Sequence, residues 1–155
     1  MIGMPGWLAL SAVVIVLDLY TKHLVLQYFA LGEHVPVTTF FDLVRYHNEG
    51  AAFSFLAGAG GWQRVFFSAI AIIASVVIVY LLRKHGTRRL FCFALALVLG
   101  GALGNLYDRL TLGYVVDFLF FHYQTWYWPA FNVADSAITC GVVLLLIDSF
   151  RKPAP

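Results

Sequence analysis

The sequence contains few charged residues. Its ten lysines and arginines and eight aspartates and glutamates make up 12% of 155 residues, whereas 61% of the residues are hydrophobic. An average soluble domain is about a quarter charged. So few polar side chains cannot cover the surface of one globule, which excludes a soluble domain, and such high hydrophobicity excludes intrinsic disorder. The composition therefore predicts a small integral membrane protein.

Cysteines are also scarce, and the residues that could bind a metal are scattered. The two cysteines, Cys92 and Cys140, each lie within an apolar run, where a thiol behaves as a small hydrophobic side chain. A disulfide framework needs more cysteines in polar loops, and the five histidines do not cluster. We therefore expect no disulfide and no metal site. The net charge of +2, without a basic stripe, argues against nucleic-acid binding.

Four apolar segments are long enough to cross a membrane, which takes about 20 residues of helix. The second and third are uncharged over most of their length, whereas the first and fourth each contain charged side chains. We predict an all-α membrane protein that forms a single domain over residues 1–155. Its transmembrane helices are expected at roughly residues 7–28, 62–82, 90–107 and 130–150.

The basic residues predict how the chain is oriented in the membrane. Lysine and arginine concentrate in loops on the cytoplasmic side. Here they gather in the link between the second and third segments and in the C-terminal tail, as Arg83, Lys84, Arg88, Arg89, Arg151 and Lys152. Both termini are therefore expected in the cytoplasm, and the other two links, 31–61 and 110–129, face outward.

Both outward links have an unusual composition. The first is rich in β-branched and aromatic residues between Val35 and Tyr46 and ends at a turn-forming stretch, 48–50, which predicts a strand or hairpin on the membrane surface. The second carries eight aromatic residues, a density typical of the lipid headgroup level. The first link is therefore expected to be β-rich and to lie outside the membrane.

Carboxylates inside a membrane are costly, so each one needs an explanation. Asp18 lies four residues before Lys22, the spacing and order of a helical ion pair. The two side chains either form a structural pair or anchor a polar group of a ligand near the outer half of the membrane. Asp148 lies near the cytoplasmic end of the fourth segment, beside Arg151 and Lys152, and is expected to be an interfacial charge.

Asp117 and Asp135 have no basic residue nearby in sequence. Asp117 lies in the aromatic outer link and Asp135 about five residues into the fourth helix, so the two can meet just below the outer surface. Two carboxyls at one site tend to share a proton. Aspartic proteases use this arrangement, with one carboxylate activating water and its protonated partner polarising the scissile carbonyl. The spacing alone fits a proton or ion relay equally well.

Three polar residues accompany these aspartates. Asn132 lies three residues before Asp135, where its amide could orient that carboxylate or cap the helix. Asn105 and Arg109 lie four residues apart near the end of the third helix and point one face toward the outer link. Helix packing explains Gly100 and Gly104 in the same segment, but it does not explain the asparagine and the arginine as well.

Five sequence blocks are spread over most of the chain: DLYTK (18–22), NEGAAF (48–53), GGALGNLYDR (100–109), VVDF (115–118) and FNVADS (131–136). Together they resemble those of the bacterial lipoprotein signal peptidases, also called type II signal peptidases. One departure is Leu19, where the family often has glutamine; the flanking aspartate and lysine are kept. The resemblance implies that the first outer link, around Val35 to Phe53, forms a small β-rich cradle outside the membrane.

The resemblance implies an aspartic endopeptidase of the bacterial cytoplasmic (inner) membrane that needs no cofactor. Such an enzyme removes the signal peptide from diacylglyceryl-modified prolipoproteins, cutting just before the lipidated cysteine near the periplasmic face. Membrane lipid and the inhibitor globomycin are further implied partners, and four spans need no second subunit. The family's catalytic pair falls on Asp117 and Asp135, and its supporting residues fall on Asn48, Asn105, Arg109, Asn132, Asp18 and Lys22.

The alternative is a small proton-coupled membrane carrier that uses the same carboxylates as a relay. It would need a polar track across the membrane, but residues 65–82 are uncharged and the cytoplasmic half of the third segment has no polar residue.

The roles of the two aspartates in a catalytic pair follow from their positions. Asp135 lies near a helix N-terminus, which favours its charged form. We therefore expect Asp135 to act as the base and Asp117 as the acid.

Overall fold

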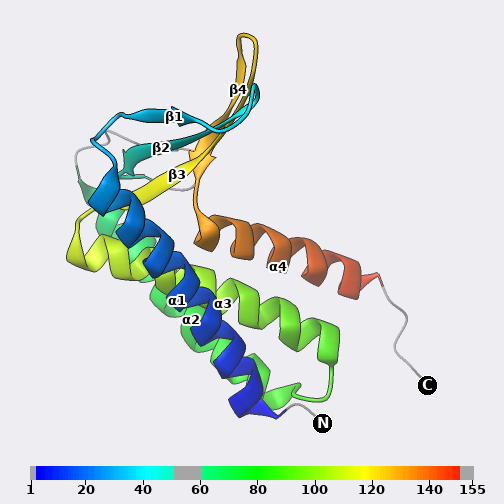
Figure 1. Cartoon of the computed structure of the whole chain (residues 1–155). Helices are drawn as coiled ribbons and strands as arrows, with labels where there is room; N and C mark the ends of the chain where they lie inside the picture. The colour runs from blue at the N-terminus through cyan, green and yellow to red at the C-terminus, as the bar shows by residue number, and fades with distance from the viewer. Residues whose placement is uncertain (1–2, 51–60, 151–155) are drawn as a thin grey trace.

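The computed structural model describes residues 3–50 and 61–150, which fold into a helical bundle with a small antiparallel sheet at one end (Figure 1). Residues 51–53 of the second sequence block and the basic residues at 151–152 lie outside the described residues. In chain order the elements are α1 Met4–Tyr28, β1 His34–Pro36, β2 Phe41–Asn48, α2 Trp62–Lys84, α3 Arg89–Thr111, β3 Val115–Tyr123, β4 Trp126–Phe131 and α4 Val133–Ser149.

Within the described residues, α1, α2 and α3 are long and apolar enough to cross a membrane. The fourth helix, α4, has 17 residues, fewer than the about 20 that a perpendicular span needs. Its predicted start at residue 130 is wrong because Ala130 and Phe131 belong to β4. The predicted end of the third helix at residue 107 is also wrong, since α3 continues to Thr111 and carries Arg109 within it.

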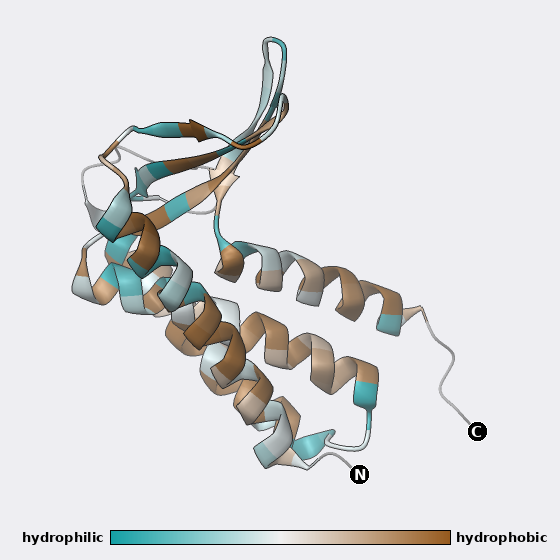
Figure 2. Ribbon diagram, in the orientation of Figure 1, coloured by the Kyte–Doolittle hydropathy of each residue, from teal (hydrophilic) through white to brown (hydrophobic). Residues whose placement is uncertain are grey.

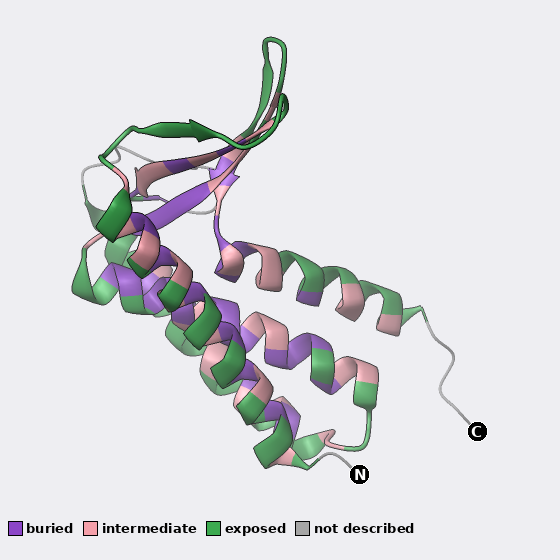
Figure 3. Ribbon diagram, viewed as in Figure 1, coloured by how far each residue is buried: buried purple, intermediate pink, exposed green. Residues whose placement is uncertain are grey.

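The helix α3 forms the centre of the bundle and packs against α1, α2 and α4. Its glycines permit this packing, as predicted. A Cβ atom at Gly100 would collide with the side chain of Val14 on α1, and one at Gly104 with the carboxylate of Asp18. The outer faces of α1 and α2 are hydrophobic and exposed, with Val16 65% and Val76 66% exposed (Figures 2 and 3). Such faces suit contact with lipid tails.

The sheet has the strand order β1-β2-β3-β4, with every pair antiparallel. The β1–β2 pair confirms the hairpin predicted in the first outer link. For the aromatic second link, composition predicts only a position at the headgroup level. In the structure most of this link forms β3 and β4, a hairpin that reaches away from the helices (Figure 1). Because β3 follows α3 and β4 precedes α4, the sheet holds the ends of these two helices together.

Candidate active site

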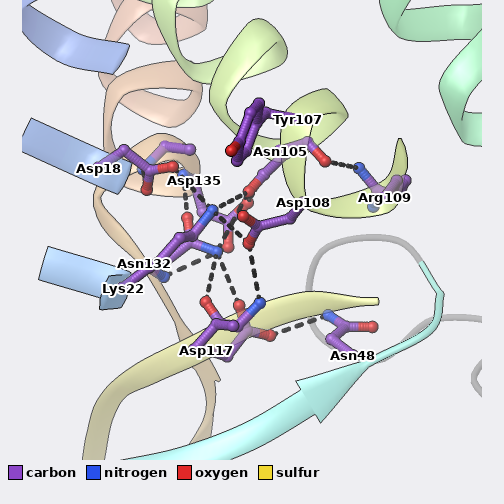
Figure 4. Close-up of polar contacts among 12 residues, drawn as sticks. Asp18, Lys22, Asn48, Asn105, Tyr107, Asp108, Arg109, Asp117, Asn132 and Asp135 are labelled. Carbon is purple, nitrogen blue, oxygen red and sulfur yellow. Dashed lines mark hydrogen bonds and ion pairs between the residues drawn. The ribbon is translucent and has the colours of Figure 1, made fainter. Parts of the chain in front are cut away.

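Asp117 on β3 and Asp135 in the first turn of α4 are held by one side chain, that of Asn132 (Figure 4). Asn132 Nδ2 donates to Asp117 Oδ1 at 2.8 Å. Its Oδ1 accepts from the Asp135 backbone N–H at 2.9 Å, and the Asn132 backbone N–H donates to Asp135 Oδ2 at 3.3 Å. Asn132 is therefore both the cap of α4 and an orienting group, so the two roles considered from sequence hold together.

Each carboxylate also accepts a hydrogen bond from the side-chain amide of a second asparagine, which lies on a different element. Asn48 at the end of β2 donates Nδ2 to Asp117 Oδ2 at 2.9 Å. Asn105 on α3 donates Nδ2 to Asp135 Oδ1 at 2.8 Å. Both aspartates are buried, with Asp117 only 2% and Asp135 7% exposed. The orienting amides thus fix both carboxylates in a site from which bulk water is largely excluded.

Asp135 is the third residue of α4 and lies two residues into the helix, not the predicted five, because α4 begins at Val133. At about 1.5 Å per residue, its Cα lies about 3 Å along the helix axis from that of Val133. The N-terminus of a helix carries a partial positive charge, which favours a carboxylate in the first turn.

Asp18 and Lys22 form the predicted ion pair, with Lys22 Nζ 2.7 Å from Asp18 Oδ2. The same Nζ donates to Asn105 Oδ1 at 2.9 Å, and Asp18 Oδ1 accepts from the Ala134 backbone N–H at 2.8 Å. This pair therefore lies directly behind the two aspartates and orients their neighbours. Its polar atoms already have partners inside the protein, which favours a structural pair over an anchor for a ligand.

Asp108 is a site residue that sequence reasoning does not single out. Its Oδ2 lies 3.0 Å from Lys22 Nζ and accepts from the Val116 backbone N–H at 3.1 Å. It thereby joins α1 and α3 to the strand position next to Asp117. A signal is present in the sequence, because a carboxylate near the end of an apolar helix is costly unless it has a partner.

Arg109 reaches a different part of the site. Its Nη2 donates to the carbonyl oxygen of Gly50 at 2.8 Å, and its guanidinium lies over the ring of Phe67, 5.5 Å from the centroid. Its hydrogen bonds go to backbone carbonyls and not to either aspartate. Arg109 thus holds the backbone that follows Asn48, the residue that orients Asp117.

Burial and the nearby charge of Asp135 raise the pKa of Asp117 to about 7, against the opposing effect of the hydrogen bonds from Asn48 and Asn132. A carboxyl with this pKa is protonated in much of the population at neutral pH. The raised pKa therefore lets the Asp117 carboxyl hold a proton near neutral pH.

Asp117 opens onto a cavity of about 450 Å³ that is lined by residues of the strands β2, β3 and β4. Asp135 lines a second, mostly apolar cavity of about 260 Å³ together with Trp128, Phe131, Ser136, Thr139 and Cys140. The first cavity is bounded by Tyr46, His47, Asn48, Asp117, Phe120, Tyr127, Pro129 and Ala130. A peptide that lies along the sheet can therefore reach Asp117 through the first cavity. An apolar group beside α4 can reach Asp135 through the second.

The side chains around the aspartates are amides, one ammonium and further carboxylates. Over residues 3–50 and 61–150, no three histidine, cysteine, aspartate or glutamate side chains lie close enough together to hold a metal ion. The polar groups present can position water, a peptide carbonyl and protons between two carboxyls.

Residues 10–151 match the family model of signal peptidase (SPase) II. The chain belongs to the signal peptidase II family. The lipoprotein signal peptidases of Paraburkholderia phytofirmans and Ralstonia nicotianae are each 57% identical over 150 residues, which cover 97% of this chain and 87% of theirs. A solved bacterial membrane enzyme structure, obtained by the in meso method at 2.3 Å resolution, matches with a TM-score of 0.83 at 31% identity. That match covers 96% of this chain and 93% of the other.

The resemblance found in the sequence is thereby confirmed. Members of this family are aspartic proteases, and the chain is a multi-pass membrane enzyme that removes signal peptides from prolipoproteins. The carrier alternative is not favoured.

Proposed function

We propose that Asp117 and Asp135 are the catalytic dyad of this signal peptidase. The observation that carries the assignment is the side chain of Asn132, which bonds to Asp117 and caps the turn that holds Asp135. Two carboxyls that both accept hydrogen bonds from one asparagine, with the pKa of Asp117 raised to about 7, match the unequal protonation that aspartic proteases require.

In the proposed reaction, the Asp135 carboxylate takes a proton from water as the water oxygen attacks the scissile carbonyl carbon. The Asp117 O–H donates to the carbonyl oxygen and stabilises the tetrahedral intermediate. The proton taken by Asp135 then passes to the departing amide nitrogen. As the C–N bond breaks, Asp117 takes back its proton from the hydroxyl of the intermediate, which leaves a carboxylic acid and restores the Asp117 O–H. Asn48, Asn105 and Asn132 keep the carboxyls in place, while Asp18, Lys22 and Arg109 position these amides and the neighbouring backbone.

We further propose that the substrate carries a diacylglyceryl group and is cut just before the lipidated cysteine. The apolar cavity beside Asp135, lined by Trp128, Phe131 and Cys140 among others, suits acyl chain atoms within reach of the dyad. The cavity at Asp117 suits the peptide, and globomycin would block the site by occupying it. The reaction uses no cofactor.

We propose a single domain with four transmembrane helices and both termini in the cytoplasm of a bacterial cell, acting as a monomer in the inner membrane. Seventeen residues of α4 span about 25 Å at ~1.5 Å per residue, somewhat less than the about 30 Å hydrocarbon core. Support for the orientation comes from Arg83, Lys84 and Arg88, which lie at the bundle end opposite the sheet. The sheet and the dyad then lie at the periplasmic face, in contact with membrane lipid.

The test is cleavage of a diacylglyceryl-modified prolipoprotein by the purified enzyme in detergent, followed by gel shift. We expect Asp117→Asn to abolish cleavage while it keeps the wild-type thermal unfolding profile. Asp148→Asn is the matched control, since Asp148 pairs with Arg88 near the C-terminal end of α4, far from the dyad. Full activity of Asp117→Asn, or equal loss in Asp148→Asn, would contradict the assignment.

A further inference from the structure

The sheet contains a second cluster of ionisable side chains, separate from the dyad. Asp42 on β2 is buried between two histidines, with Oδ2 3.1 Å from His34 Nδ1 on β1 and Oδ1 3.1 Å from His122 Nε2 on β3. His34 Nε2 lies 2.5 Å from the hydroxyl of Tyr46. The dyad mechanism uses none of these four residues, which we call the clamp.

Asp42 acts as a charged acceptor in the clamp. Although burial works to raise its pKa, the hydrogen bonds from His34 and His122 hold the pKa of this carboxyl below its ordinary value. Burial and the charge of Asp42 raise the pKa of the Tyr46 hydroxyl, so that group stays protonated. The carboxylate therefore fixes one nitrogen, and hence the ring orientation, of each histidine.

The rings fixed by the clamp surround Phe120. The ring centroid of Phe120 lies 5.4 Å from that of His34, 5.6 Å from that of His122 and 6.3 Å from that of Tyr46. Tyr127 on β4 completes the enclosure at 5.9 Å. Aromatic contacts at these separations favour particular ring orientations, so the clamp constrains the ring of Phe120, against which Tyr127 packs.

Phe120 and Tyr127 form a wall that two cavities share. One side faces the cavity of about 450 Å³ at Asp117, and the other faces a cavity of about 260 Å³ that the clamp lines. Phe120 follows Asp117 by three residues on β3, a separation of about 10 Å along a strand. In Figure 1, β3 runs from the helices toward the hairpin tip, so Phe120 lies farther from the bundle than Asp117.

We propose that the Phe120–Tyr127 wall is a specificity surface for the substrate residues that follow the cut, and that the clamp is its positioning device. This inference rests on the proposed function. The signal helix lies in the membrane, so the extended chain that leaves the dyad toward the hairpin tip is the mature part of the prolipoprotein. At about 3.3 Å per residue, the wall meets roughly the third residue after the cut. Aromatic rings favour an apolar side chain there over a charged one.

The experiment measures kcat/KM for diacylglyceryl-modified prolipoproteins that differ only in that third residue, leucine or aspartate. For the wild type we expect a preference for leucine of about tenfold, the discrimination typical of one small apolar group in a hydrophobic pocket. A second substrate pair, with the same exchange at the eighth residue after the cut, serves as the control and should be cleaved at equal rates.

Variants separate positioning from general stability. Phe120→Ala should bring the leucine-to-aspartate ratio of kcat/KM close to one. Asp42→Asn should lower the same ratio. The double variant should have the same ratio as Phe120→Ala alone. Glu33→Gln is the matched control: this exposed carboxylate accepts from the Ala30 backbone N–H and should leave the ratio unchanged. Should Asp42→Asn fail to fold, His34→Gln carries the test, since His34 has a side chain 38% exposed.

A wild-type ratio near one at the third residue would overturn the specificity surface. An Asp42→Asn variant that folds and slows both substrates equally would overturn the clamp, because a merely structural role changes rates without changing the ratio. If the wild type cleaved neither substrate, the proposed function itself would be wrong. Equal cleavage of both would overturn this inference alone.

Discussion

Asn132 donates its side-chain amide to Asp117 at 2.8 Å although the two residues lie on different elements, the start of α4 and strand β3. This bond links the side chain of Asp117 directly to the start of the helix that carries Asp135. The capping box formed by the same side chain means that the geometry of the dyad and the start of α4 depend on one residue.

Asn132→Ser separates these two roles. A serine hydroxyl still caps the helix, so the free energy of unfolding should fall by the about 1–3 kcal/mol that unpaired buried acceptors cost, here those of Asp117 and Val116. Its shorter side chain cannot reach Asp117, and we expect kcat to fall about 100-fold, in the range found when a reacting group is misplaced by about 1 Å. Thermal unfolding and the single-turnover cleavage rate measure the two effects. A variant with wild-type kcat would show that the bond to Asp117 is not needed.

Asp108→Asn should destabilise the protein strongly. Lys22 is 2% exposed and would lose one of its two carboxylate partners, and removing one member of a buried ion pair costs about 3–5 kcal/mol. Asp148→Asn is the comparison, because its pair with Arg88 is 52% exposed on the arginine side and such pairs contribute about 0–1 kcal/mol. Chemical denaturation in detergent gives both values. Equal losses in the two variants would contradict the role of Asp108.

The pH profile of the single-turnover rate should fall on the alkaline side with a midpoint near the Asp117 pKa of about 7. Asp117 has to carry the proton that it donates to the carbonyl oxygen, so activity is lost as the pH rises through this pKa. Asn48 donates to Asp117 and favours the charged form. Removing it in Asn48→Ala therefore raises the pKa, and the alkaline limb moves to higher pH. A limb that stays in place or moves to lower pH would argue against Asp117 as the acid.

Gly101→Ala should damage the site from a distance. A Cβ atom at Gly101 would press on the backbone oxygen of Ala134 and the side chain of Ile138, which would displace the first turn of α4 and with it Asp135. Overpacking of this kind costs about 1–3 kcal/mol. Gly86→Ala is the control, since its Cβ would meet only Leu82 O at an ordinary 3.5 Å. We expect lower thermal stability and kcat in the first variant alone; unchanged values there would mean that the α3–α4 contact can adjust.

The sequence predicts the contacts of the site that form within one helix, but not those between distant segments. The Asp18–Lys22 pair is predictable because both residues lie on one helix at a fixed spacing. The place of Asn132 at the start of the fourth helix is predictable for the same local reason. Contacts between distant segments are different: Asn48 lies 69 residues from Asp117 and the two meet through β2–β3 pairing, which no local pattern reveals. For such contacts, only the family resemblance indicates which residues belong to the site.

The sequence does not predict the strands β3 and β4. Composition assigns their aromatic residues to the headgroup level, but it does not distinguish a loop from a hairpin. The hairpin also moves the start of the fourth helix from the predicted residue 130 to Val133. Asp42, His34 and His122 meet only through the pairing of three strands, so no local pattern groups them.

The most direct test of the dyad is the single-turnover cleavage rate of Asp117→Asn, Asp135→Asn and the double variant, each checked for its thermal unfolding profile. Catalytic residues that act as a unit are strongly non-additive. We predict that each single variant is as inactive as the double variant. A single variant that keeps substantial activity, or a double variant far slower than either single one, would contradict a dyad formed by Asp117 and Asp135.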